Sequence, residues 1–543
     1  MIPSSSVSFL FLMLSTDSVT GLLQPLTLKT RNLPVAWQLS QRTRPSTACS
    51  RYGKFSLGST SEDIEFDMNE LEVDEEDLLA QKEEWMQSLS QCAKSSIFDD
   101  TAIAKAQAVF DEMFQAYVKT DNSALFPGVE VYNLMIETHA YGKDEKGGEE
   151  AEMILERMED SNVAFVARPN LETYLNVMDA WAMRKNPEKA EAVLTRLKKR
   201  YAETNDEDVQ PTIAATNKLI KSYGMRGDIE KAESIFRDSL DEEGILKANH
   251  KTWVQIMKAY IPQEMGYEKV NDLFQEMRKA YRMGEEEYLP KTEAYNALIR
   301  ALGHKGTGGQ EAEKLLFEMI EQFQAGDDDV RPTADTFRNT IAAQLYRRNF
   351  SSAKAEQLLQ IQEGLYRTTG FPDLKIDTRS NNAALKVMSK TRDSKKAIRA
   401  KRVVENMKNS GDPDNMPTKT SYRSLLTACA FTRGDPEESL ETFQVAIETM
   451  KDLKEIVGEE PDSGFVGLFL KACANLMPAS RKRDAVVEKI FTKCCADGLL
   501  NDFVLVEFER AASETLQLEI LGGFLEDNVR LPEEWSRNIQ QKQ

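Results

Sequence analysis

One short pattern recurs along most of the chain: a step that often contains proline, a polar residue, and then apolar residues at helical spacing. Its first three copies begin at Phe126, Arg168 and Gln210, which lie 42 residues apart. Six further copies begin at Lys247, Leu289, Arg331, Lys375, Met416 and Glu460. A period of this size is the signature of a solenoid, in which each repeat packs only against its neighbours.

Each repeat is predicted to form two helices. A proline cannot continue a helix, and the Thr, Ser or Asn that often follows it favours a helix start. Apolar residues then recur at helical spacing, as in Tyr295, Leu298, Ile299 and Leu302, before a glycine-containing break and a second helix. Because neither amphipathic helix can bury its apolar face alone, we expect an all-α fold of about nine to eleven stacked helix-turn-helix repeats, with the array over residues 129–502.

Charge divides the N-terminal part of the chain. The protein carries a net charge of −20, yet residues 1–60 hold six Lys/Arg against one acid, and residues 61–79 hold ten acids and no base. A basic, Ser/Thr-rich and acid-poor start is typical of organelle transit peptides, and the short apolar run ahead of it favours a plastid slightly over a mitochondrion. We predict a disordered targeting presequence over 1–60 and an acidic linker over 61–80. A disordered tail without a targeting role is the alternative.

The flanks of the array are predicted to be helical caps. Residues 81–128 contain A-K-A-Q-A-V-F-D-E-M, which resembles a second helix, and are expected to form a degenerate repeat or an N-terminal cap. Residues 503–543 are expected to form a C-terminal helical cap and tail. No segment after the N-terminus has the length and apolarity of a membrane span, so no membrane partner is expected.

Catalytic chemistry is not indicated. The six cysteines include no CxxC pair and the three histidines lie far apart, so we expect neither a metal site nor a cofactor. The stretch Gly303–Gly309 could cradle a phosphate, but it matches no nucleotide motif and falls where other repeats have their break. We interpret it as a turn between two helices. The acidic triplets 206–208, 285–287 and 327–329 are interpreted as solvated loops between repeats rather than cation sites.

Three stretches carry a family resemblance: Ala294 to Ile299 (A-Y-N-A-L-I), Ala312 to Met319 (A-E-K-L-L-F-E-M) and the tripeptide R-P-N from Arg168. They resemble the pentatricopeptide repeat, although the repeats here are longer than is usual in that family. The resemblance implies a right-handed α-solenoid that binds single-stranded RNA in mitochondria or plastids, one nucleotide per repeat, without catalysis.

In this family the fifth and the last residue of a repeat contact one base, whose edges single-stranded RNA exposes. Carried over, the base-reading residues are Asn133, Asn217, Asn296 and Asn382 at fifth positions and Asn170, Asn249, Thr333 and Thr418 at last positions. The family associates asparagine at the fifth position with pyrimidines, which predicts pyrimidines at alternate nucleotides. The intervening fifth positions are Leu175, Val254, Arg338 and Arg423, from which we derive no base. The alternative for each asparagine is a helix cap.

Cations that could contact RNA phosphates cluster in three places. They are Lys218, Lys221 and Arg226, then Arg347 and Arg348, then Lys386 and Lys390, the last pair in a dense group with Arg392, Lys395 and Lys396. As a channel lining they would give salt-dependent binding. The alternative is a solvated face.

We therefore expect a non-enzymatic, monomeric protein that binds single-stranded RNA in organellar RNA processing, stabilisation or translation. Organellar RNA-processing or ribosomal proteins are the further partners to expect. The alternative is a protein-interaction scaffold built from the same helical repeats, which the acidic body and the four unusual fifth positions favour. A nuclease domain is not expected, because only about 40 residues follow the last repeat.

Overall fold

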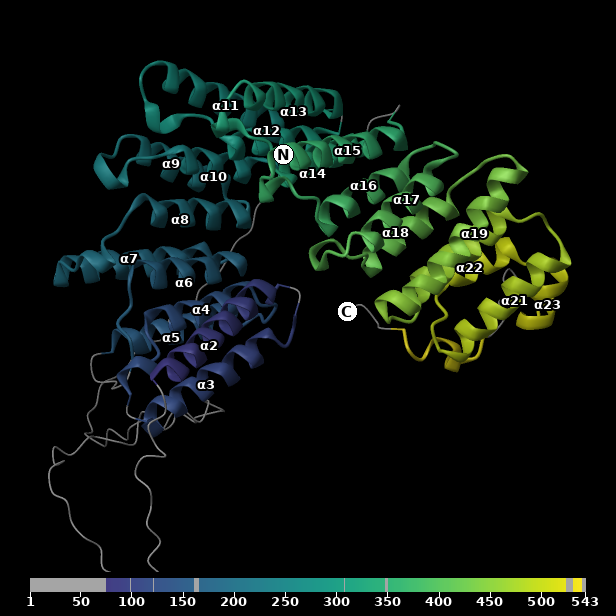
Figure 1. The fold of residues 1–543 in the computed structure, drawn as a ribbon, viewed down its shortest axis with the longest axis horizontal. Helices are drawn as coiled ribbons and strands as arrows, with labels where there is room; N and C mark the ends of the chain where they lie inside the picture. The colour runs from purple at the N-terminus through teal and green to yellow at the C-terminus, as the bar shows by residue number, and fades with distance from the viewer. Residues whose placement is uncertain are drawn as a thin grey trace, which may run out of the picture. The chain divides into compact units, whose positions relative to one another are not determined.

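The computed structural model describes residues 75–97, 99–120, 122–160, 166–306, 308–346, 350–523 and 531–539. These residues form helices joined by short turns, with no β-strand among them, as Figure 1 shows. The expected all-α fold of stacked helical pairs is confirmed. Within these ranges, no helix combines the length and the apolarity needed to cross a membrane. The predicted presequence lies outside the described residues.

The chain divides into two compact units, and each is considered by itself. The first comprises residues up to 143 together with 153–168, and it contains α2 (Glu75–Ser95), α3 (Ala102–Thr120) and α4 (Val129–Tyr141). Helix α5 (Gly147–Glu159) has residues in both units. Because α2 already begins at Glu75, the end of the predicted acidic linker is helical. Acidic residues suit a helix start, where the backbone carries partial positive charge.

In the second compact unit, first and second helices of the repeats alternate. The first helices are α6 (Leu171–Met183), α8 (Ile213–Arg226), α10 (His250–Tyr260), α12 (Thr292–Lys305), α14 (Ala334–Ala343), α16 (Thr378–Lys390), α18 (Lys419–Ala430), α20 (Ser463–Leu476) and α22 (Asp502–Ala511). The second helices are α7 (Pro187–Thr204), α9 (Ile229–Leu240), α11 (Gly266–Arg282), α13 (Gly309–Gln324), α15 (Ser352–Thr369), α17 (Lys396–Asn409), α19 (Pro436–Asp452), α21 (Arg481–Ala496) and α23 (Glu514–Leu521). Figure 1 labels all of these helices except α20.

The first helices form one continuous row. Each contacts the first helix of the next repeat, from α6 through to α22, and those from α6 to α20 also contact the second helix of their own repeat. An aromatic residue at the fourth position of a repeat often fills the space between these helices. Tyr174, Trp253, Phe337 and Tyr422 hold this position, and each is at most 1% exposed. The core is therefore repeated along the row, as expected for a solenoid.

The glycine-rich stretch Gly303–Gly309 is the turn between α12 and α13. Helix α12 ends at Lys305, and Gly306 follows with a φ of 76°, a left-handed conformation that glycine adopts without a Cβ clash. Helix α13 then begins at Gly309. The interpretation as a helix-to-helix turn is confirmed.

The acidic loops between repeats, which were predicted to be solvated, also form ion pairs. In five successive repeats, a base near the start of the first helix forms an ion pair with an acid in the loop that ends the same repeat. We call these pairs end clasps. They are Lys247–Glu285, Lys291–Asp329, Arg331–Asp373, Lys375–Asp412 and Lys419–Glu459, with N–O distances of 2.5 to 3.0 Å.

Two of the clasp acids, Glu285 and Asp329, belong to the predicted acidic triplets. Both triplets are exposed, as expected for solvated loops, and these two acids additionally contact a distant base that the sequence pattern did not show. Each clasp is partly exposed, so its contribution to stability is at most about 1 kcal/mol. Their regular occurrence gives the longer inter-repeat loops a structural role.

Candidate nucleic-acid interface

A groove of about 670 Å³ crosses three neighbouring first helices, α8, α10 and α12. Its lining contains no carboxylate, and its basic residues are Lys218, Lys221, Lys251, Lys258, Arg300 and His304. We call it the basic groove. In a protein of net charge −20, such a local concentration of cations is the surface most able to attract a polyanion.

Three of the cations in the basic groove hold the same place in successive repeats. Positions are counted from the first residue of the first helix of each repeat. Each of these three residues, Lys221, Lys258 and Arg300, is then the ninth residue of its repeat, four positions after the fifth. Because α8, α10 and α12 stack side by side, these residues line up across the groove. Sequence analysis missed Lys258 and Arg300. A comparison of the repeats position by position would have found them.

A buried carboxylate orients two of the predicted phosphate contacts. Asp179 on α6 is 2% exposed, and it forms ion pairs with Lys218 and, at 2.7 Å, with Lys221. Since one carboxylate serves two ammonium groups, net positive charge remains at this edge of the groove. Lys218 and Lys221 thus lie close together as predicted, and the carboxylate of Asp179 fixes the position of both ammonium groups.

The other cations of the groove lack such a partner. The side chains of Lys251, Lys258 and Arg300 form no hydrogen bond or ion pair with any residue in the described ranges. Although much of Lys258 is exposed, loss of hydration around its ammonium lowers its pKa; Glu293 opposes this shift, while Arg300 and Lys221 reinforce it. Positive charge is therefore crowded in the groove, and a bound anion would relieve the crowding.

The floor of the basic groove is set by a close helix approach. A Cβ on Gly224 of α8 would come within 2.5 Å of the Cβ of Ala259 on α10, so glycine permits the observed spacing. Among the lining residues of this groove there is no Phe, Tyr or Trp, and the imidazole of His304 is the single aromatic ring. A nucleic acid bound here would be held by charge and hydrogen bonds rather than by base stacking, so its affinity would depend strongly on salt.

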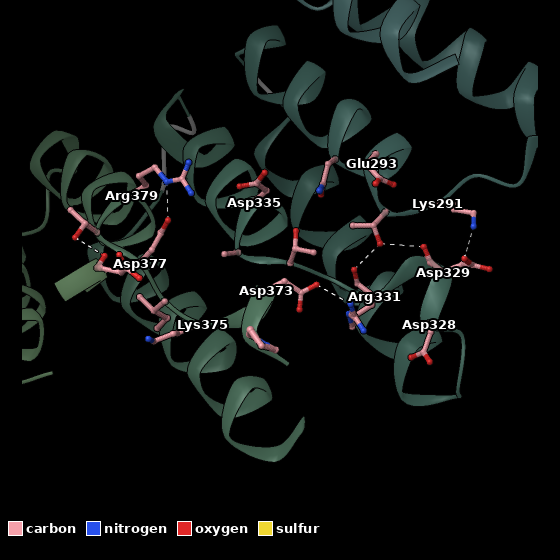
Figure 2. Close-up of a pocket in the computed structure, with 18 residues that line it drawn as sticks. Lys291, Glu293, Asp328, Asp329, Arg331, Asp335, Asp373, Lys375, Asp377 and Arg379 are labelled. Carbon is pink, nitrogen blue, oxygen red and sulfur yellow. Dashed lines mark hydrogen bonds and ion pairs between the residues drawn. The ribbon is translucent and has the colours of Figure 1, made fainter. Parts of the chain in front are cut away.

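A second hollow, of about 880 Å³, lies at the N-terminal ends of α12, α14 and α16. Figure 2 shows the charged side chains around it. Its carboxylates are Glu293, Asp328, Asp329, Asp335, Asp373, Asp377 and Asp414, and its cations are Lys291, Arg331, Lys375 and Arg379. We call it the acidic hollow. Its surplus of negative charge disfavours phosphate groups.

The four asparagines at fifth positions have different surroundings. The Oδ1 atoms of Asn217 and Asn296 are buried, and within the described residues neither accepts a hydrogen bond. Asn217 lines the basic groove, whereas Asn296 lines the acidic hollow. Asn133 on α4 is only 4% exposed. The Oδ1 of Asn382 accepts a hydrogen bond of 2.6 Å from Ser421. Of the two asparagines with an unpartnered amide oxygen, Asn217 is therefore the one that lines a groove with cations and no carboxylate.

The polar residues at last positions cap the first helices. Asn170 accepts a hydrogen bond from the backbone N–H of Thr173, and Asn249 accepts from Lys251 and Thr252. Thr333 and Thr418 form capping boxes with residues three positions later. The capping alternative is confirmed for Asn170 and Asn249. In Asn249 the cap occupies the amide oxygen and leaves the amide N–H₂ group.

In three successive repeats the structure brings the fifth and the last residue together. The Nδ2 of Asn382 lies 3.5 Å from the Oγ1 of Thr418. The same two positions hold Arg338 and Asp377, 3.9 Å apart, in the preceding repeat. In the following repeat they hold Arg423 and Asp462, 2.6 Å apart. By contrast, no hydrogen bond in the described residues links Asn217 with Asn249, or Asn296 with Thr333.

The remaining predicted cations lie apart from the basic groove. Arg226 is held in ion pairs by Glu188 and Asp228. Lys386 and Lys390 are exposed on α16. Arg347 and Arg348 lie outside the described residues. The predicted dense cluster is also smaller than expected, because Lys396 is 3% exposed and its Nζ donates to the carbonyl of Thr391 at 2.9 Å.

Lys396 gives a prediction about pH. Burial lowers its pKa from 10.5 to about 8, while Asp393 and Cys429 oppose the shift. Between these two values the unfolded chain holds a proton that the folded protein has released, so folding stability rises with pH; below pH 8 both states are protonated and the slope vanishes. The full gain is roughly 3 kcal/mol.

Because cysteines and tyrosines titrate in the same range, the effect is measured as a difference. Urea unfolding of the wild type and of Lys396→Met at intervals from pH 7 to 10.5 should show the wild type gaining stability relative to the variant as pH rises. Lys395→Met, at the exposed neighbour, is the control and should run parallel to the wild type. Parallel curves for Lys396→Met as well would show that this lysine is not desolvated.

Comparison with known proteins bears on this surface. Residues 215–242, which lie within and between α8 and α9, match the family profile described as the PPR repeat, the pentatricopeptide repeat. The same pair of helices recurs through the described chain. At this repeat the chain matches the pentatricopeptide repeat family. The matched repeat contributes Asn217, Lys218 and Lys221 to the basic groove, and the match indicates no catalytic family.

Solved structures of pentatricopeptide repeat proteins are also similar to this chain. One is the crystal structure of PPR10 from maize, at 17% sequence identity and a TM-score of 0.37, with 82% of this chain and 59% of that chain covered. This chain therefore spans less than two thirds of that structure's length. Another is PPR10 in complex with an 18-nt psaJ RNA element, at 15% identity and a TM-score of 0.29, covering 82% and 75%. A search of curated proteins returned no match.

Proposed function

We propose that this pentatricopeptide repeat protein binds single-stranded RNA in the basic groove. The observation that carries the proposal is the column of Lys221, Lys258 and Arg300 across three successive repeats. Lys258 and Arg300 have no counter-ion in the described chain, so a phosphate would not have to displace a carboxylate to reach them. The family match to the repeat that forms one wall of the groove supports the same conclusion.

Single-stranded rather than duplex RNA fits the chemistry of this surface. Asn217 offers an amide whose Oδ1 is buried without a partner, beside the cations of the groove. Such an amide can satisfy both its donor and its acceptor on the edge of an unpaired base, and duplex RNA does not present that edge. The cations would position the backbone, and the asparagine would select the base.

An equilibrium titration of fluorescent RNA tests the base contact. We expect Asn217→Ala to weaken binding by about 1 kcal/mol, the value of a neutral hydrogen bond, for a pyrimidine-rich strand. The loss should be smaller for a purine-rich strand of equal length. Asn382→Ala is the matched control, because its amide is already bonded within the protein.

Two outcomes would contradict the proposal. Equal losses of affinity for pyrimidine and purine strands in Asn217→Ala would show that Asn217 does not distinguish bases. Failure of the wild type to bind any single strand at low salt would remove the function, and recovery of proteins alone after crosslinking in cells would then favour a scaffold.

The setting of this function is also part of the proposal. We propose that the protein acts on organellar transcripts in a plastid or mitochondrion, together with RNA-processing or ribosomal proteins. The basic, acid-poor composition of residues 1–60 supports an organelle address. A fluorescent protein carrying residues 1–60 should enter one of these organelles, and purely cytosolic fluorescence would exclude the address.

A further inference from the structure

The row of first helices changes character after α12. Up to that helix, the ninth residue of successive repeats is Lys221, Lys258 and Arg300, and the next repeat has Ala342 in this place. The hollow beside α12, α14 and α16 is the acidic one. A polyanion that follows the row from α8 would therefore lose its cations and meet carboxylates at α14.

From the same boundary onward, the fifth residues of three successive repeats, which could contact bases, contact other residues of the protein instead. At Arg338 and Arg423, the guanidinium group at the fifth position pairs with the carboxylate at the last position. Arg338 is additionally paired with Asp335, and Arg423 lies over the ring of Phe465, 5.0 Å from its centroid. A base could enter at Arg423 only by separating opposite charges that lie 2.6 Å apart. At Arg338 the contact with Asp377 is longer, and the buried Nη1 of Arg338 has no hydrogen-bond partner among the described residues, so closure there is by the bulk and charge of the pair.

The repeat between these two is closed by hydrogen bonds. The oxygen of the Asn382 amide accepts from Ser421, and its nitrogen faces Thr418. From α14 to α18, three successive fifth positions therefore contact the last residue of their own repeat. Asn217 differs, because its amide oxygen has no partner among the described residues.

The row is bounded at its other end as well. In the repeat before α8, the fifth residue is the apolar Leu175 and the ninth is Asp179, the acid that holds Lys218 and Lys221. A phosphate at that place would face a buried carboxylate instead of a cation. Opposing features thus flank the basic groove on both sides along the second compact unit.

We infer that RNA occupies only the α8–α12 part of the row, and that the α14–α18 part is closed to it by contacts between fifth and last residues. The inference rests on the proposed RNA binding. It makes the footprint about three to four nucleotides, one for each stacked first helix of the groove, rather than one for every repeat in the array. Arg338 and Arg423 then limit the length of the bound strand instead of contacting it.

Binding of labelled oligouridylates from three to twelve nucleotides tests the inference on the full chain. We expect affinity to reach a plateau near four nucleotides and to rise beyond it only in proportion to the number of binding registers. Lys258→Gln should weaken binding several-fold at every length. Lys386→Gln, at the ninth position of a closed repeat, is the matched control and should change affinity less than two-fold, as should Arg338→Gln and Arg423→Gln.

Each alternative result has a distinct meaning. A further tenfold gain between six and twelve nucleotides above the register count, or a tenfold loss in Arg338→Gln with its melting temperature preserved, would overturn the confined site. RNA binding itself would then still stand. No binding of any length at low salt, by a wild type that melts cooperatively, would instead refute the proposed function and the confined site with it.

Discussion

A variant that reverses the column of the basic groove, Lys221→Glu with Lys258→Glu and Arg300→Glu, is expected to bind single-stranded RNA at least about 100-fold more weakly than the wild type. Each lost charge-assisted contact to a phosphate is worth about 1.5 kcal/mol or more, and about 1.4 kcal/mol corresponds to a factor of ten. Repulsion from the introduced carboxylates adds to the loss. The slope of log affinity against log salt concentration should also become shallower by roughly 2, because binding releases fewer counterions once three phosphate contacts are lost.

The matched control changes the same charge in the same repeats. Lys231→Glu, Lys279→Glu and Lys314→Glu alter exposed lysines on the second helices α9, α11 and α13, outside the basic groove. We expect this control to lose only a few-fold in affinity, through the change in net charge. If both triple variants lose the same factor in affinity, the net charge of the whole protein governs RNA binding and the basic groove does not. Fluorescence anisotropy over a range of salt concentrations gives both quantities.

The largest loss of stability is expected from Trp253→Ala. Trp253 is 1% exposed, and its ring packs edge-on against Phe236 and Tyr288, with centroids 4.8 and 5.7 Å away. Removal of a buried tryptophan typically costs about 3 to 5 kcal/mol. Trp253→Phe is the control and should cost much less, because it keeps an aromatic ring and removes an indole N–H that has no partner in the described chain.

The location of the damage is as informative as its size. In a solenoid each repeat is stabilised by its neighbours, so the loss should concentrate in α8 to α13 instead of spreading evenly. Hydrogen exchange should therefore show α10 and α11 losing protection first while α18 to α22 keep theirs. Uniform loss of protection in Trp253→Ala would show that the array unfolds as a single cooperative unit.

The fold was predictable because its determinants are local and repeated. Helix starts such as Thr333 and Asn249 depend on side chains within three residues, and the period reveals the stacking. The candidate site was only half predictable. Asn217, Lys218 and Lys221 follow from the family resemblance, but Lys258 and Arg300 join them only when first helices are placed side by side.

Partnerships across repeats were beyond the sequence pattern. Asp179 lies 42 residues before Lys221, so their ion pair depends on how neighbouring repeats stack. Asp377 lies 39 residues after Arg338, at the opposite end of the same repeat, so their contact depends on how that repeat folds back on itself. The same limit explains Lys396, whose burial depends on packing that a run of basic residues does not reveal. Charge counted along a chain cannot show which cations are already neutralised.

The end clasps have a consequence for how such an array could change its length. Each clasp joins a base and an acid that belong to one repeat, as with Lys247 and Glu285 or Lys291 and Asp329. A duplicated or deleted repeat would therefore bring or remove both halves of its clasp together, and the clasps of the neighbouring repeats would stay paired. Growth or shortening by whole repeats thus preserves every remaining clasp, whereas a cut inside a repeat leaves one ion of its clasp without a partner.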